Sequence, residues 1–251
     1  MEEPGDQVLL MFATFGMEIV ECGGAIAKHV RAGGTAYAAV AFARPESRQQ
    51  VEAAARILGV TETRFLGLDS GDIVPGAASK LPFVSLVREW RPGIVIMQDP
   101  VHAFGDLDPG RRDMIHLYME SLAHAGRDWR VGECGDRAPH NIRAIYYMTP
   151  TSPNCVVDVA DVWDVKERAM DELKSQMAFS GEHHKRLLGA TSRIIAPDAD
   201  PDGDPAVFGR AIHRATDLAY HVTTAVHSHS GLALAEAYRR EGPFTFDRLP
   251  A

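Results

Sequence analysis

An apolar run that breaks into a turn of small residues, VLLMFATFGMEIVECGG from Val8 to Gly24, constrains the fold of this chain most strongly. The run up to Thr14 has the composition of a buried strand, and the residues from Glu18 onward are typical of a helix start. We interpret the stretch as the first strand of a parallel sheet that passes into the first helix. Because ligands bind at the carboxyl ends of the strands in such sheets, residues 14–18 are expected at a functional site.

Strand-like and helix-like segments alternate along the rest of the chain. Glycines end the first two helices, and Arg91-Pro92 stops the third. This alternation predicts an α/β fold, with a Rossmann-like, mostly parallel sheet and helices on both faces. The expected strands are 7–14, 35–43, 63–66, 93–98, 143–148 and 155–159, and the expected helices are 18–32, 45–58, 80–90, 111–126, 163–177 and 207–224. Residues 99–110 are expected to form a loop at the carboxyl edge, and residues 232–239 fit a strand or a helix.

Length and charge limit the classes of protein to which the chain can belong. Its 251 residues suffice for one α/β core and are too few for two ordinary domains with a linker, so we expect residues 1–251 to form a single domain. The net charge of −8, without a stripe of Lys and Arg, argues against a nucleic-acid partner. No apolar run reaches the ~18 residues of a membrane span. Three cysteines, and an acidic start without an apolar signal segment, predict a cytoplasmic protein without disulfides.

The opening stretch resembles the first motif of the LmbE/PIG-L family of zinc-dependent N-deacetylases and amidases. That motif reads roughly Ala-His-Pro-Asp-Asp-Glu, followed by a turn and Cys-Gly-Gly. This chain has ATFGME at residues 13–18 and CGG at residues 22–24, without a gap. In the family, the His and the second Asp bind zinc and the first Asp is the general base. Those three positions hold Thr14, Met17 and Gly16 here, so the frame of the motif is kept and its chemistry is not.

The resemblance covers most of the chain. Arg48 and residues 53–59 fit the family's second helix, and Ser70 stands where the family has the Asp of an Asp-Gly pair. The C-terminal segment AEAY, at residues 235–238, resembles the family's Ala-Glu-Ala-Phe. The family's His-x-Asp-His motif falls on residues 108–111, with Asp108 in place of the His that stabilises the tetrahedral intermediate and Arg111 in place of the third zinc ligand. The resemblance therefore implies the fold, while zinc is expected to be absent and no other cofactor is predicted.

Arg111 is the replacement that suggests a new role. An arginine at a helix N-terminus can bind a carboxylate or a phosphate, so we expect it to anchor a small anionic ligand. Alternatively, Arg111 pairs with Glu18 or Asp108 and fills an abandoned site. Acidic residues and a histidine nearby could supply acid–base chemistry, or could rebuild a different metal site. The catalytic candidates are Glu18, His102, Asp106 and Asp108, and the substrate-binding candidates are Arg111, Thr14, Gly16, Met17, Glu21, Arg48 and Ser70.

Three functions are compatible with this pattern. The first is a repurposed, metal-independent enzyme that acts on a small, anionic molecule in a specialised biosynthetic pathway. The second is an inactive pseudoenzyme that serves as a binding partner or scaffold, as a homo-oligomer or beside an active enzyme. The third is a metal-dependent N-deacetylase or amidase whose ligands have moved. The sequence favours the first, because the replacements include charged residues rather than uniformly inert ones.

Overall fold

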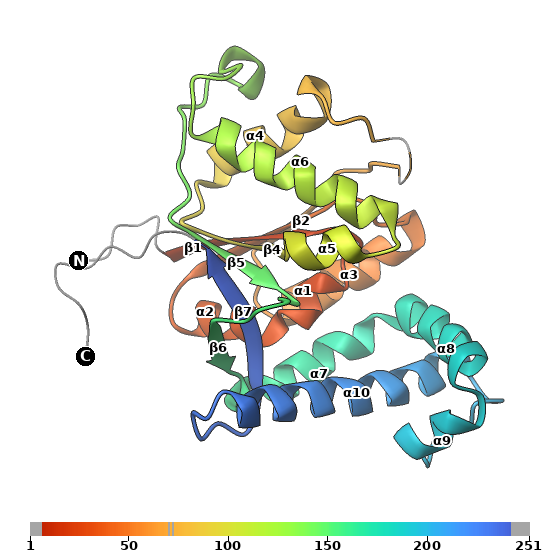
Figure 1. Ribbon diagram of the computed structural model, residues 1–251. Helices are drawn as coiled ribbons and strands as arrows, with labels where there is room; N and C mark the ends of the chain where they lie inside the picture. Colours follow the sequence, from red (N-terminus) through yellow and green to blue (C-terminus); the bar gives the residue numbers. More distant parts are fainter. Residues whose placement is uncertain (1–6, 70, 72, 242–251) are drawn as a thin grey trace.

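The computed structural model describes residues 7–69, 71 and 73–241, and a seven-stranded sheet forms its centre. The strands are β1 (Val8–Ala13), β2 (Thr35–Val40), β3 (Glu62–Phe65), β4 (Ile94–Gln98), β5 (Ala144–Met148), β6 (Cys155–Asp158) and β7 (Ala235–Glu241). They lie in the order β3-β2-β1-β4-β5-β7-β6 (Figure 1). β1 to β5 pair in parallel, and β7 runs antiparallel to both of its neighbours. The predicted Rossmann-like, mostly parallel sheet is therefore confirmed.

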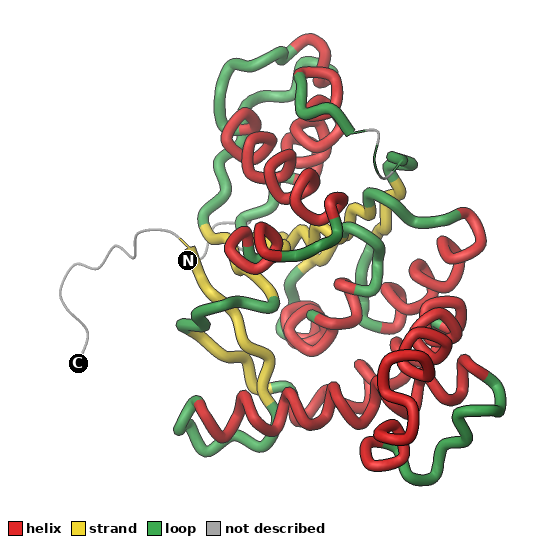
Figure 2. The backbone as a smooth tube through the Cα atoms, turned by 45° about the vertical axis from the view of Figure 1, so that its right-hand side comes forward, coloured by secondary structure: helices red, strands yellow, loops and turns green. Residues whose placement is uncertain are grey.

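Helices cover both faces of this sheet. The α-helices are α1 (Glu18–Glu21), α2 (Gly23–Arg31), α3 (Pro45–Ile57), α4 (Ala77–Trp90), α5 (Pro100–Gly105), α6 (Pro109–Ala125), α7 (Trp163–Glu172), α8 (Lys174–Leu188), α9 (Ser192–Ile195) and α10 (Pro205–His227). Short 3₁₀ helices lie at Gly132–Cys134, Ala160–Val162 and Gly189–Thr191. Figure 1 shows α4 and α6 on one face and α1, α2 and α3 on the other. The long α10 packs along α8, beyond the second face (Figure 2).

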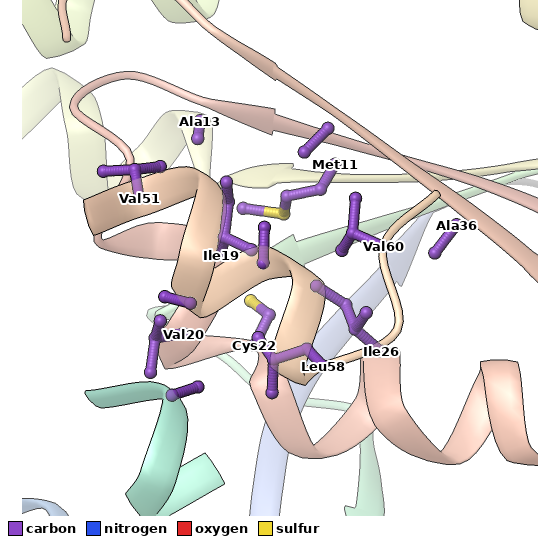
Figure 3. Close-up of a cluster of buried hydrophobic side chains, with 14 of the residues drawn as sticks. Met11, Ala13, Ile19, Val20, Cys22, Ile26, Ala36, Val51, Leu58 and Val60 are labelled. Atoms are coloured by element: carbon purple, nitrogen blue, oxygen red, sulfur yellow. The ribbon is translucent and has the colours of Figure 1, made fainter. Parts of the chain in front are cut away.

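The apolar run of β1 explains why the chain is organised around it. Leu9, Met11 and Ala13 pack on the α1–α3 face, whereas Leu10 and Phe12 pack on the α4–α6 face. A central parallel strand is buried on both faces, so its sequence is continuously apolar rather than alternating. Figure 3 shows side chains of β1 meeting those of the two helices that follow it. Among the described residues, no helix combines the length and the apolar character needed to cross a membrane.

Three expected elements are wrong, all at helices: the loop over 99–110, the single helix over 163–177, and the single helix over 18–32, which is two helices, α1 and α2. Residues 99–110 are not a continuous loop, because Asp99 caps α5 by accepting a hydrogen bond from the Val101 backbone N–H at 2.9 Å and Pro100 occupies the first turn. The single helix expected over 163–177 is two helices. Leu173, with φ −82° and ψ 48°, leaves the helical conformation and buries its side chain in the core. Neither a proline nor a glycine marks that break.

The remaining points concern the break in the first helix and one undecided segment. The first helix is interrupted at Cys22, with φ −94° and ψ 13°, and continues as α2. A side chain at the second glycine of the motif would collide with the residue that follows β6, because a Cβ on Gly24 would lie 2.4 Å from Cγ1 of Val159. The segment 232–239, which fitted a strand or a helix, overlaps β7 at residues 235–239. Its strand character follows from hydrogen bonding to both β5 and β6.

Candidate functional site

The turn after β1 is held by the Glu18 carboxylate. Its Oε2 accepts a hydrogen bond of 2.9 Å from the backbone N–H of Gly16, and both carboxylate oxygens lie within 3.3 Å of the backbone N of Phe15. Gly16 has φ +104°, and a Cβ there would lie 2.9 Å from the Val51 side chain, so the turn requires glycine at this position. Glu18 is almost fully buried, and Thr14 is buried beneath the turn. The Glu18 carboxylate therefore stabilises the turn by accepting hydrogen bonds from its backbone.

Arg111 projects from the first turn of α6, where Asp108 is the N-cap and accepts a hydrogen bond from Gly110 N at 2.8 Å. Its Nη1 donates to Oε1 of buried Gln98 at 3.2 Å, and its Nε lies 3.5 Å from Oδ2 of Asp106. The guanidinium also lies over the ring of Phe15, 5.5 Å from the centroid. In the described contacts, the acidic partner of Arg111 is thus Asp106, and the expected alternatives of Glu18 and Asp108 are wrong.

A cleft of about 390 Å³ opens between this turn, the start of α3, the start of α6 and α8. Five candidates from the sequence line it together, and they are Met17, Glu18, Glu21, Asp108 and Arg111. The other lining residues are Phe15, Phe42, Arg44, Glu46, Ser47, Ser175, Gln176 and Phe179. Residues of two motifs that are distant in the sequence therefore line one cavity.

Other candidates lie outside the lining of this cleft. His102 is exposed on α5, and Arg48 donates from Nε to the Ala43 carbonyl at 3.2 Å, with its guanidinium over the Phe65 ring. Asp106 does not line the cleft and forms an ion pair with Arg111, which does. Ser70 falls outside the described residues. The structure therefore does not bring His102 or Arg48 to the ligand space.

A second cavity, of about 220 Å³, adjoins the first, and Met17 and Glu21 line both. Four sulfur-containing side chains line it, those of Met17, Cys22, Met148 and Met170, and α10 and β7 contribute most of the other lining residues. The remaining lining residues are Thr149, His213, Thr216, Asp217, Tyr220, His221, Glu236, Ala237 and Tyr238. The sequence does not reveal this cavity, because its lining residues are spread from position 17 to position 238. The only sequence signal was the AEAY segment, which supported the resemblance without suggesting a site.

A buried ionic network supports the second cavity. The Lys166 ammonium donates to Oε1 of Glu236 at 3.1 Å, to the Glu21 carbonyl at 2.7 Å, and to Nε2 of His221 at 3.1 Å. A neutral His221 with its proton on Nδ1 satisfies both that contact and the 2.7 Å contact of Nδ1 with the Asp217 carbonyl. The network links α1, α7, α10 and β7 through one ammonium group.

Glu236 is the acceptor at the centre of this network. It receives hydrogen bonds from the backbone N–H groups of Gly24 and Ala25, at 2.8 and 2.9 Å, and from the Tyr238 hydroxyl at 2.7 Å. Burial by itself would raise the pKa of Glu236, but the Lys166 ammonium and these hydrogen bonds lower it to about 2. The carboxylate therefore stays ionised and ties β7 to the N-terminus of α2.

Glu21 has the opposite electrostatic setting. Burial and the negative charge of Glu18 raise its pKa to about 7, against the lowering effect of Arg111 and Lys166. Asp217 adds a further, smaller raising effect. Glu21 is consequently the acidic residue at the junction of the two cavities that can change its protonation near neutral pH.

The described part of the chain contains no group of three or more His, Cys, Asp or Glu side chains placed to hold a metal ion. The positions that bind zinc in the family present a hydroxyl from Thr14, a thioether from Met17 and a guanidinium from Arg111.

Comparison with known proteins supports the fold and the resemblance to deacetylases. No protein-family model matches the chain. A diacetylchitobiose deacetylase of Thermococcus kodakarensis is 30% identical over 130 residues, which are 51% of this chain and 48% of that protein. The chain thus aligns with about half the length of this relative.

Three solved structures share the architecture over nearly the whole chain. The N,N'-diacetylchitobiose deacetylase of Pyrococcus horikoshii has a TM-score of 0.69 and 18% identity, covering 94% of this chain and 84% of its own. The conserved protein TT1542 of Thermus thermophilus has a TM-score of 0.68 and 18% identity, covering 96% and 97%. The 4-carboxy-2-hydroxymuconate hydratase of Pseudomonas putida has a TM-score of 0.69 and 17% identity, covering 97% and 100%. The sequence match over half of the chain and the shared fold together confirm the resemblance to LmbE/PIG-L-type deacetylases that the motifs indicated.

Proposed function

We propose that this chain is an enzyme that acts without zinc on a small molecule bearing an anionic group, which Arg111 binds in the cleft. The observation that carries the proposal is the guanidinium on the wall of that cleft, oriented by Gln98 and Asp106. A specialised biosynthetic pathway is the setting in which we expect such a repurposed enzyme.

The residues at the inherited metal position fit zinc poorly. Catalytic zinc is held by His, Cys or carboxylate ligands, usually three of them together with a water molecule. Thr14, Met17 and Arg111 offer none of these ligands, and the fixed positive charge of an arginine repels a metal ion. No step of the proposed reaction is therefore assigned to zinc.

The setting of Arg111 suits an anionic group. A guanidinium has five N–H donors, and the described contacts use two of its nitrogens, so donors remain for a ligand. The residue lies in the first turn of the 17-residue helix α6, whose N-terminal dipole favours negative charge. The hydratase that shares this fold is named for a carboxylated substrate, which supports small carboxylates as the class to test.

The acidic residues around the cleft narrow the expected ligand. Glu18, Glu21, Glu46 and Asp108 line the same cleft as Arg111, and they disfavour a second anionic group near them. We therefore expect one carboxylate or phosphate on Arg111, with hydroxyl or amine groups facing the acidic wall. A cavity of about 390 Å³ is within the usual range for small-molecule sites.

Ligand-observed NMR with lactate tests this proposal, using wild type, Arg111→Gln and Arg112→Gln. Arg112 is the matched control, because it is the exposed neighbour on the same helix turn. A charge-assisted hydrogen bond is worth about 1.5–3 kcal/mol, so Arg111→Gln is expected to weaken carboxylate binding at least about tenfold. Arg112→Gln is expected to change it less than about twofold. Equal binding by all three proteins would refute the proposal.

A metal-dependent N-deacetylase with relocated ligands is the second candidate, favoured by the diacetylchitobiose deacetylase relative. Acetate release from N,N'-diacetylchitobiose, measured with added zinc and with a chelator, separates the two. Our proposal predicts less than stoichiometric zinc after purification and no chelator-sensitive acetate release. Binding of carboxylates to Arg111 without turnover of any candidate substrate would instead indicate a scaffold or binding protein.

A further inference from the structure

Glu21 lies at the junction of the two cavities. It and Met17 line both, and of these two only Glu21 has a side chain that can accept or donate a proton. α1 ends at this residue and the chain turns at Cys22, so the carboxyl group is presented at a corner rather than along a helix face. A ligand that extends from Arg111 into the second cavity must pass it.

The backbone at Glu21 is fixed by a hydrogen bond from Lys166. The buried Lys166 ammonium donates to the Glu21 carbonyl oxygen at 2.7 Å, and the same ammonium is held by Glu236 and His221. This hydrogen bond fixes the position of the Glu21 backbone and does not involve the side-chain carboxyl oxygens. The residue is therefore preorganised in the way expected of a group that acts on a ligand.

Charged groups from four elements surround the side chain. Glu18 of α1 and Asp217 of α10 disfavour its ionised form, whereas Arg111 of α6 and Lys166 of α7 favour it. His213 and His221 of α10 line the second cavity as well. Burial and these opposing charges act on the Glu21 carboxyl group together, so removing one of the charges shifts its pKa.

From this geometry we infer that Glu21 exchanges a proton with the ligand bound between the two cavities, an inference that rests on the proposed function. In one direction, the neutral carboxyl group gives its proton to the ligand and becomes a carboxylate. In the return step, the carboxylate takes up a proton from an acidic position of the ligand, or a free proton from the solvent. Proton and charge balance over the cycle, and no co-reactant is required.

Ligand binding is expected to favour protonation of Glu21. An anionic group on Arg111 offsets the positive charge that favours ionised Glu21, and it adds a negative charge nearby. Binding therefore raises the affinity of Glu21 for a proton, and by linkage a carboxylate binds more tightly when Glu21 is protonated. Carboxylate affinity is expected to increase as the pH falls through neutrality.

The test is a pH titration of protein labelled with ¹³C at the glutamate carboxyl carbons, with Glu21 assigned from the signal missing in Glu21→Gln. We expect a midpoint near 7 in wild type, an upward shift in Arg111→Gln, and a downward shift in Asp217→Asn. Saturating lactate should move the wild-type midpoint upward, and the affinity for lactate should lose its pH dependence in Glu21→Gln and regain it in Glu21→Asp. Circular dichroism checks that each variant is folded.

The outcomes separate this inference from the proposed function. If Arg111→Gln abolishes lactate binding but Glu21 titrates at an ordinary carboxyl pKa, the inference is wrong and the proposed function stands. If Glu21 titrates near 7 but lactate leaves its midpoint unchanged, proton exchange with the ligand is also excluded. If Arg111→Gln binds lactate as wild type does, the proposed function fails and the inference fails with it.

Discussion

Replacing Lys166 by methionine tests how the buried network stabilises the fold. The Lys166 side chain is 1% exposed and that of Glu236 is 4% exposed, so Lys166→Met leaves a buried carboxylate without its ammonium. Removing one partner of a buried ion pair costs about 3–5 kcal/mol. The hydrogen bonds that Glu236 keeps with Gly24, Ala25 and Tyr238 place the expected loss at the lower end of that range.

The pH dependence of this loss follows from Glu236. Its pKa is about 2 in the folded protein, against an ordinary value of 4.5, a difference that corresponds to about 3 kcal/mol. Because the folded pKa is the lower one, this stability is present above pH 4.5 and is lost as the pH falls from 4.5 towards 2. Without the ammonium, Glu236 takes up a proton more readily. The destabilisation by Lys166→Met is therefore expected to be largest at pH 7 and smaller near pH 3.5.

Urea unfolding followed by circular dichroism, at pH 7 and at pH 3.5, measures both effects. Lys174→Met is the matched control, since Lys174 is exposed at the start of α8, and it is expected to change stability by less than about 0.5 kcal/mol. The double variant Lys166→Met/Glu236→Gln should be more stable than Lys166→Met, because the uncompensated charge is gone. A loss below about 1 kcal/mol in Lys166→Met, or a double variant less stable than the single one, would refute the reasoning.

Two further predictions concern packing and a half-buried histidine. Gly24→Ala should destabilise the fold by about 1–3 kcal/mol in urea unfolding, because the new Cβ would lie 2.4 Å from Cγ1 of Val159, whereas Gly105→Ala, whose Cβ meets nothing within 4 Å, should be neutral within about 0.5 kcal/mol. Burial and the neighbouring charge of His184 lower the pKa of His213 to about 4. Between pH 6.5 and about 4 the unfolded chain therefore binds this proton more strongly than the folded protein does. The wild-type free energy of unfolding should decrease as the pH falls through that window. His213→Asn should remove that part of the pH dependence and the exposed His116→Asn should retain it, as thermal unfolding at several pH values would reveal; an unchanged slope in His213→Asn would contradict the assigned pKa.

The sequence determined the layers of the fold through local, short-range signals. The continuous apolar run of β1 required a strand buried on both faces, and the alternation of segments required a parallel sheet. It also brought Glu18, Asp108 and Arg111 to one cleft, because residues that follow neighbouring parallel strands lie at the same sheet edge. The register of the two motifs was enough to place them there.

Tertiary structure decided what those residues touch. The partner of Arg111 is Asp106 rather than Glu18, because Glu18 is already occupied by the backbone N–H groups of its own turn. The break at Leu173 carries no proline or glycine, since it is enforced by burial of the leucine in a core assembled from other elements.

The second cavity depended on tertiary structure in the same way. Lys166 and Glu236 are 70 residues apart, and no periodicity or spacing connects them. The pKa of Glu21 is raised by its burial and by the charges of Glu18 and Asp217, against the lowering effect of Arg111 and Lys166, and these groups meet only after the chain has folded. Hydrophobic patterning acts between neighbours in the sequence and can be read from it, whereas electrostatic coupling acts through space and requires the folded arrangement.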